Sequence, residues 1–149
     1  MVDRKARNQL IDAIGGLAAG RIDNFDFDAV VDCIQTDDTG VVRIRHAIWH
    51  VYDDFHRHTL TGKWVLSDAQ NKIVERFILF LRSNLDYQWP PQPLGNPFAR
   101  LLVGIFTLGF IPRYFDKKWR ACGSWEVWPF ISVGEFNDAK RGRRGPVKE

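Results

Sequence analysis

Two histidines and an aspartate in the middle of the chain have a spacing that could bind a metal ion. His46 and His50 lie one helical turn apart, and Asp53 follows on nearly the same face of a helix. Two imidazoles and a carboxylate could hold one zinc or iron ion and support a metal-dependent enzyme. However, no catalytic glutamate lies between the histidines, and no second ligand pair occurs elsewhere in the chain. The sequence favours the alternative, a solvated helix face on which Asp53 pairs with Arg57, and therefore predicts no cofactor.

The other residue types that commonly do chemistry lie in no catalytic motif. The serines occur in no nucleophile elbow, and neither cysteine has a local signature that links it to a histidine. Cys33 lies next to an apolar helix face and is predicted to be buried, whereas Cys122 is predicted to be exposed in an irregular stretch. Residues 61–63 resemble only the end of a phosphate-binding loop, because the upstream glycine is missing and Trp64 replaces the hydroxyl residue. The sequence thus favours a protein without catalytic activity but leaves the question open.

Basic residues near the C-terminus offer a different chemistry. Residues 140–149 carry five basic residues and one acidic residue, a net +4 within a total of +3, which leaves −1 for the rest of the chain. Arg141, Arg143 and Arg144 could bind the phosphate backbone of a nucleic acid without reading its bases. The composition favours a disordered, solubilising end of the chain over nucleic-acid binding. We therefore predict a folded domain over residues 1–139 and a basic, disordered tail over residues 140–149.

Tryptophan is abundant and lies mostly outside the strongest helical patterns. Five of the six tryptophans fall in predicted loops or short elements. Such residues commonly pack irregular segments onto a core, but tryptophan and arginine are also enriched at the hot spots of protein interfaces. Partly exposed tryptophans beside arginines would form a recognition surface for another protein. The predicted binding residues are Trp64, Trp89, Arg113, Arg120, Trp125 and Trp128.

Length and composition indicate one globular domain. A chain of 149 residues with 45% hydrophobic and 13% aromatic content can bury a sizeable core. The charged start of the chain does not resemble a signal peptide, and the two cysteines have no metal-type spacing. The longest apolar run, Leu101–Ile111, is too short to span a bilayer. These features predict a cytoplasmic protein with free thiols and no membrane span, and they leave its oligomeric state open.

The histidines must be positioned by the segment with the strongest helical pattern. Apolar residues recur in Val41–His58 at alternating spacings of three and four, which predicts a central helix. Asp38 or Thr39 is expected to cap this helix, and Thr59–Gly62 is expected to end it. Its apolar stripe consists of Val41, Ile44, Ile48, Val51 and Phe55.

A second long helix is predicted over Asp68–Asn84. Ser67 and Gln70 fit a capping box, in which each side chain satisfies a backbone donor of the other residue. Apolar residues cover most of the circumference of this helix, which is typical of a helix buried on several sides. We expect it to pack antiparallel to the central helix.

Capping and turn residues define the remaining elements. A first helix over residues 3–19 is expected to end at Gly20, and Asn24 is expected to cap the next helix. The C-terminal third is predicted to be irregular and rich in Trp and Pro, with its elements packed on the outside. Its elements are helices over Asn96–Leu108 and Tyr114–Ala121, an extended segment over Trp125–Ile131, and a helix that Ser132 and Glu135 cap and that ends at Ala139.

Three stretches of the chain carry a family resemblance. They are Tyr52-Asp53-Asp54 with Leu60–Lys63, Glu75–Leu81 with Tyr87–Pro90, and Trp119 with Val127–Phe130 and Phe136. Together they resemble a group of small, uncharacterised helical proteins of bacteria, and the resemblance covers roughly Leu10–Ala139. Proteins of this group are similar in size and style to immunity proteins, which neutralise toxins in bacterial competition. The resemblance implies a binding protein with no catalytic residues, whose partner is another protein such as a toxin.

Taken together, these observations predict an all-α fold. We expect a compact, single-domain bundle of five to seven helices around the antiparallel pair Val41–His58 and Asp68–Asn84. The expected function is that of a small cytoplasmic protein, immunity-like, that neutralises or regulates a partner protein by occupying its surface. The alternatives are a metal-dependent enzyme that uses His46, His50 and Asp53, and nucleic-acid binding through the tail.

Overall fold

The computed structural model describes residues 1–53, 55–91 and 110–142. These residues contain six α-helices. These residues contain no β-strand, so the predicted all-α class is confirmed. The predicted helix over Asn96–Leu108 lies outside the described residues. The helices are α1 (Arg4–Ala18), α2 (Asn24–Asp32), α3 (Thr39–Ile48), α4 (Asp68–Arg82), α6 (Phe110–Arg120) and α7 (Val133–Gly142), with 3₁₀ turns at Gly62–Trp64 and Trp125–Val127.

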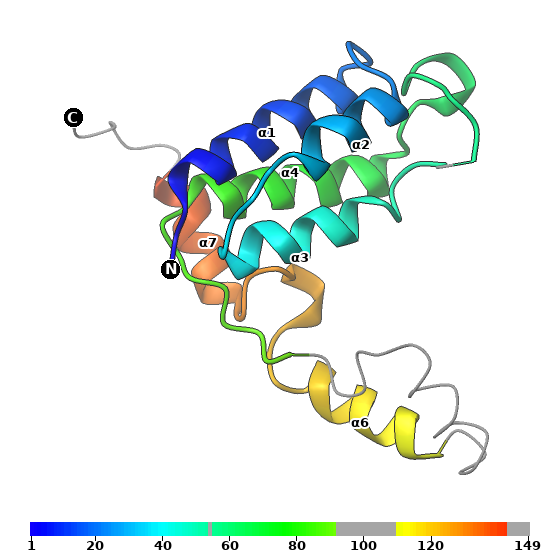
Figure 1. Ribbon diagram of the computed structural model, residues 1–149. Coiled ribbons are helices and arrows are strands. Elements are labelled where there is room, and N and C mark those ends of the chain that lie inside the picture. Colours follow the sequence, from blue (N-terminus) through cyan, green and yellow to red (C-terminus); the bar gives the residue numbers. More distant parts are fainter. Residues whose placement is uncertain (54, 92–109, 143–149) are drawn as a thin grey trace.

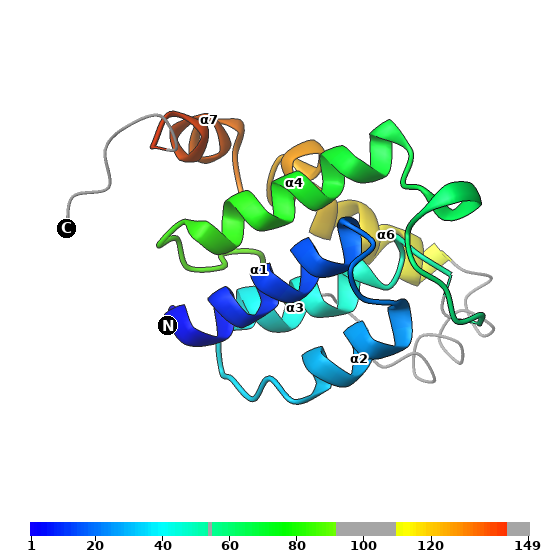
Figure 2. The same ribbon diagram turned by 90° about the horizontal axis from the view of Figure 1, so that it is seen from above.

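Helices α1 to α4 form a bundle, and the C-terminal elements pack at its side. α1 packs on α2, α3 and α4, while α4 also packs on α3 and α7. Figures 1 and 2 show that α4 runs antiparallel to α1 and α3, which confirms the predicted orientation of the central pair. α6 projects away from the bundle (Figure 1). The 3₁₀ turn at Trp125–Val127 follows α6 and leads back towards the bundle.

Local sequence signals explain where the long helices begin and end. The Asp38 carboxylate accepts a hydrogen bond from Gly40 N at the start of α3, and the capping box of Ser67 and Gln70 begins α4 as predicted. α1 ends at Ala18 and is followed by Gly20 in the left-handed region at φ 66°, a conformation that glycine adopts without strain. These three boundaries depend on contacts within a few residues of the chain.

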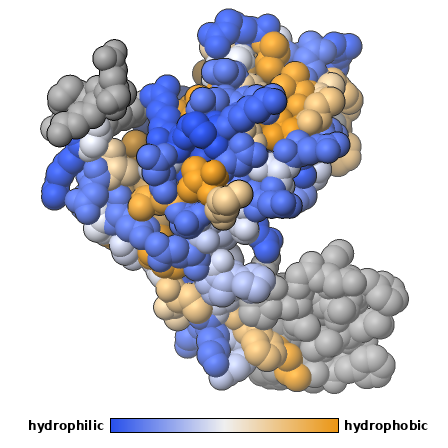
Figure 3. Space-filling model, turned by 60° about the vertical axis from the view of Figure 1, so that its left-hand side comes forward, coloured by the Kyte–Doolittle hydropathy of each residue, from blue (hydrophilic) through white to orange (hydrophobic). Residues whose placement is uncertain are grey.

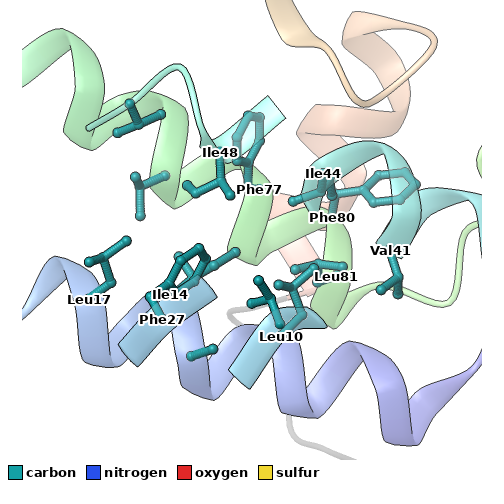
Figure 4. Packing of buried hydrophobic residues seen from close by; sticks show 14 of the residues in the cluster. Leu10, Ile14, Leu17, Phe27, Val41, Ile44, Ile48, Phe77, Phe80 and Leu81 are labelled. Carbon is teal, nitrogen blue, oxygen red and sulfur yellow. The ribbon is translucent and has the colours of Figure 1, made fainter. Parts of the chain in front are cut away.

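The core lies where the apolar faces of α1, α2, α3 and α4 meet. Leu10 and Ile14 from α1 point towards Ile44 of α3 and Leu81 of α4 (Figure 4). Phe27 of α2 is fully buried. Its ring packs edge to face on Tyr52, with ring centroids 5.8 Å apart. The face of the described residues that Figure 3 shows is largely hydrophilic and carries hydrophobic patches. No described helix has the length and apolarity to span a membrane.

The central helix is shorter than predicted, because α3 ends at Ile48 rather than near His58. Asn24 explains the difference: its Nδ2 donates to the carbonyls of Asp53 and His56 at 2.9 Å, and its Oδ1 accepts from His58 N at 2.9 Å. These bonds satisfy backbone groups that a continuing helix would have paired internally. Asn24 is therefore a buried brace for the segment after α3 and not the predicted cap of α2, which is Asp23.

The end of the predicted apolar stripe also differs. Val51 remains buried in a turn, whereas Phe55 is 86% exposed. The predicted pair of Asp53 and Arg57 does not form, because Asp53 bonds to His56 at 2.9 Å and Arg57 bonds to Asp23 at 2.6 Å. An i,i+4 pair requires a continuous helix, and the backbone has left the helix at these positions.

Three further predictions about the chain need correction. Trp125–Ile131 is not extended but begins with a 3₁₀ turn. Cys33 is exposed rather than buried, because Cys33 follows the last residue of α2 and lies off the buried face of that helix. Cys122 is exposed as predicted. Helix α7 continues past Ala139 to Gly142, three residues into the segment predicted to be a disordered tail.

A buried ion pair joins α1 to the start of α3. Arg7 is 0% exposed and Asp38 is 3% exposed, and Arg7 Nε donates to the Asp38 carboxylate at 2.7 Å. The remaining guanidinium nitrogens of Arg7 donate to the carbonyls of Ser83 and Leu85 after α4, both at 2.9 Å. A Cβ at Gly40 would lie 2.8 Å from the Phe80 ring, so the close approach of α3 to α4 here requires glycine.

Acid should destabilise the fold through Asp38. Burial alone would raise the pKa of Asp38, but hydrogen bonds from Arg7, Asp3 N and Gly40 N outweigh it and hold this pKa below its ordinary value. Because the folded-state pKa is the lower one, the stabilisation is complete above the unfolded-state pKa of about 3.9 and is lost as the pH falls through the folded-state pKa.

We therefore expect the free energy of unfolding, measured by urea titration, to fall between about pH 5 and pH 2. The Asp38→Asn variant should be less stable at pH 7 and should lose less stability over the same range. Equal losses in the two proteins would show that Asp38 does not carry this dependence.

Candidate functional site

Four indole rings gather where the C-terminal segment meets the bundle. We call Trp89, Trp119, Trp125 and Trp128 the tryptophan cluster. Their neighbouring ring centroids lie 5.2 to 6.1 Å apart, mostly in edge-to-face or tilted arrangements that suit aromatic quadrupoles. Trp89 is 4% exposed and forms the buried base of the cluster, whereas Trp125 is 45% exposed. The cluster therefore joins the interior of the protein to its surface.

Hydrogen bonds and close packing hold three of these rings in place. The indole N–H groups of Trp89, Trp119 and Trp128 donate to Phe130 O, Pro90 O and Tyr87 Oη at 3.0, 2.8 and 3.1 Å. A Cβ at Gly123 would lie 2.7 Å from Ile131 O and 3.0 Å from the Trp89 ring, so the turn closes on Trp89 only because this residue is glycine. Trp125 Nε1 has no acceptor among the described residues.

A groove of about 420 Å³ runs beside the cluster. It is lined by residues of the helical bundle and by residues of the C-terminal elements. Helix α3 contributes Arg43, His46 and Ala47, and α4 contributes Ile73, Arg76 and Phe77. The remaining described lining residues are His50, Val51, Tyr87, Trp119, Trp125 and Trp128. We call this cavity the tryptophan groove; its lining combines aromatic rings with basic side chains and includes no described Asp or Glu.

The titratable groups of the tryptophan groove are partly removed from water. Burial lowers the pKa of the Arg76 guanidinium, which nonetheless stays charged as arginine does in proteins. Burial raises the pKa of Tyr87, against the opposing effects of the Trp128 hydrogen bond and the Arg43 charge. The Tyr87 hydroxyl is therefore protonated at neutral pH. Arg120 lies outside the lining, but its Cζ is 5.6 Å from the Trp125 ring centroid, within cation–π range.

Four of the six predicted binding residues lie at or beside the tryptophan groove, whereas Arg113 and Trp64 do not. Trp125 and Trp128 line the tryptophan groove, Trp89 lies beneath them, and Arg120 flanks Trp125. Arg113 is exposed on α6 but does not line the groove. Trp64 makes no ring contact with the cluster.

Trp64 belongs to a second cavity, of about 440 Å³, that shares His50 and Val51 with the tryptophan groove. Its ring stacks on His58 with centroids 4.2 Å apart. The His58 Nδ1 atom lies 2.6 Å from His56 O and must donate to it, since a carbonyl only accepts. His58 Nε2 is buried without a described partner. The described lining of this cavity is rich in polar groups and includes no residue after Gln70.

The proposed metal ligands do not form a metal site. His46 is exposed on α3, while His50 and Asp53 follow the end of that helix, so the spacing that would have aligned them is lost. Asp53 instead bonds to His56 and to Phe55 N. Over the described residues no group of three or more His, Cys, Asp or Glu side chains could hold a metal ion.

The predicted nucleic-acid residues are only partly described. Arg141 lies on α7 and pairs with Asp138 at 3.2 Å, where both side chains are exposed. Arg143 and Arg144 lie outside the described residues. The pairing offsets the charge of Arg141, but exposed pairs of this kind are weak and would not prevent a phosphate from binding.

The groove residues that sequence reasoning did not predict as binding residues include Arg43, Arg76, Tyr87 and Trp119. The useful signal was the charged pair Glu75 and Arg76, which interrupts an otherwise apolar run in residues 73–81. A charge in a helix that is buried on several sides must reach either solvent or a polar partner, and here Arg76 donates to the carbonyl of Glu126.

Comparisons with family models, curated proteins and solved structures found no match to this chain, so the groove is the basis for inference about function.

Proposed function

We propose that this chain is a small binding protein that neutralises or regulates a partner protein by occupying its surface. The observation that carries the proposal is the tryptophan groove, in which an exposed indole and basic side chains surround a preformed hollow. Trp and Arg at the centre of a packed site are the residues that most often dominate binding energy in protein complexes. The rings of Trp119 and Trp128 are already held by hydrogen bonds, so these two side chains would lose little conformational entropy on binding.

The proposal includes a location and a class of partner. Two exposed cysteines without a disulfide suit the reducing cytoplasm. An immunity-like role would make the partner a toxin that this protein holds inactive. Metal-dependent catalysis through His46, His50 and Asp53 has no comparable preformed site among the described residues.

Affinity capture with a matched pair of variants tests the proposal. Wild-type protein immobilised and exposed to extract of its native cell should retain one stoichiometric partner, identified by mass spectrometry. The Trp125→Ala variant should not retain it, whereas Phe25→Ala should, because Phe25 is similarly exposed (46%) but lies on α2 away from the groove. Toxicity of the partner alone, relieved by co-expression of this chain, would support the immunity role. Equal capture by all three proteins, or by none, would rule out the groove as the binding surface.

A further inference from the structure

The basic side of the tryptophan groove has no counter-charge within the described lining. Arg43 and His46 come from α3, His50 follows it, and Arg76 comes from α4. The charges are local, since the chain outside residues 140–149 has a net charge of −1. A short acidic group could therefore enter the groove and meet these basic side chains without an opposing described charge in the lining.

Arg76 is the group that most needs a partner. Its Nη1 donates to Glu126 O, but its Nε is buried and has no acceptor among the described residues. A guanidinium offers five N–H donors in a planar fork that matches a carboxylate. A desolvated charge without a counter-ion is unfavourable, and an incoming carboxylate would relieve that cost.

The aromatic part of the groove lining suits an apolar side chain. Trp125 and Trp128 stand 6.1 Å apart between ring centroids, and Phe77 packs edge to face on Trp128 at 5.4 Å. The Tyr87 hydroxyl, which also belongs to the lining, accepts from Trp128 and retains its own hydrogen to donate. A volume of about 420 Å³ is sufficient for two or three side chains of a peptide segment but too small for a folded element.

We infer that the tryptophan groove receives an acidic segment of the partner protein. An Asp or Glu carboxylate of the segment pairs with Arg76, and a neighbouring apolar side chain packs against Trp125 and Trp128. The inference rests on the proposed function, because it names the chemistry of the partner at the same groove.

Selection from a phage-displayed library of random 12-residue peptides tests this inference on the full-length protein. Enriched peptides should carry Asp or Glu next to an aromatic or aliphatic residue, and their affinity should fall as the salt concentration rises. Binding should weaken by about tenfold or more in the Arg76→Met variant, as expected when a charged hydrogen bond is lost. The Arg82→Met variant is the matched control, since Arg82 is exposed on the same helix and does not line the groove. If circular dichroism shows that Arg76→Met is misfolded, Arg43→Met replaces it.

Three results would overturn the inference: enriched peptides without an excess of acidic residues, equal binding to wild type and Arg76→Met, or no enrichment at all. The capture experiment remains independent of them. Loss of the partner on Trp125→Ala together with no effect of Arg76→Met would retain the proposed function and remove only the acidic segment.

Discussion

Replacing Arg7 with methionine is expected to lower the free energy of unfolding by about 3–5 kcal/mol, the usual cost of breaking a buried ion pair from one side. The Arg7 guanidinium bonds at once to the Asp38 carboxylate and to the carbonyls of Ser83 and Leu85. It thereby ties α1 to the start of α3 and to the chain that leaves α4. Methionine retains most of the apolar stem but leaves the buried Asp38 carboxylate without the cation that is hydrogen-bonded to it.

Urea unfolding of the wild type and three variants measures this effect. The double variant Arg7→Met/Asp38→Leu should be more stable than Arg7→Met alone, because it removes the uncompensated charge as well as the pair. Arg82→Met should be within about 0.5 kcal/mol of the wild type, as is usual for an exposed residue. A loss below about 1 kcal/mol in Arg7→Met would mean that water or a rearranged donor reaches Asp38 and that the pair is not essential.

Truncation of Trp125 to alanine is expected to weaken the complex with the captured partner by about 2 kcal/mol or more, roughly a thirtyfold rise in Kd. Trp125 is the most exposed indole of the tryptophan cluster and lies between Arg120 and Trp128. Truncation would remove the apolar wall of the groove and the stacking surface for Arg120. The fold should be little affected, since Trp125 is 45% exposed.

Isothermal titration calorimetry with the purified partner gives the affinity, and urea unfolding gives the stability of each variant. Phe25→Ala should bind as the wild type does. Trp89→Ala, unlike Trp125→Ala, should greatly lower the free energy of unfolding, because Trp89 is 4% exposed and forms the buried base of the cluster. Unchanged affinity in Trp125→Ala and Trp128→Ala would place the binding surface elsewhere, with the Trp64 cavity as the next candidate.

Features that depend on residues within one or two helical turns could be predicted from the sequence. Asp38 caps α3, Ser67 with Gln70 begins α4, and Gly20 follows the end of α1, in each case through contacts of a few residues. The apolar stripe of α3 was equally readable, because burial of one helix face imposes its period on the sequence. The all-α class follows from several such segments together.

The candidate site was predicted only in part, because its residues come together through contacts between distant segments of the chain. Residue type suggested Trp125, Trp128 and Arg120 as members of a recognition surface, and all three lie at the tryptophan groove. Nothing in the local sequence indicated that Arg43 and Arg76 face these residues, since they come from two helices far away along the chain. Trp64 has the same composition signal but lies in a different cavity.

By itself, then, the sequence determined the all-α class, the caps of α3 and α4 and the apolar faces of the long helices, because local hydrogen bonds and periodic burial encode these directly. Only the tertiary structure decided where α3 ends, since the bonds of Asn24 to Asp53, His56 and His58 compete with helix continuation across about thirty residues of chain. The same long-range packing separated the proposed metal ligands and assembled the groove from α3, α4 and the C-terminal segment. Contacts of this range depend on how all the faces fit together, which no local pattern specifies.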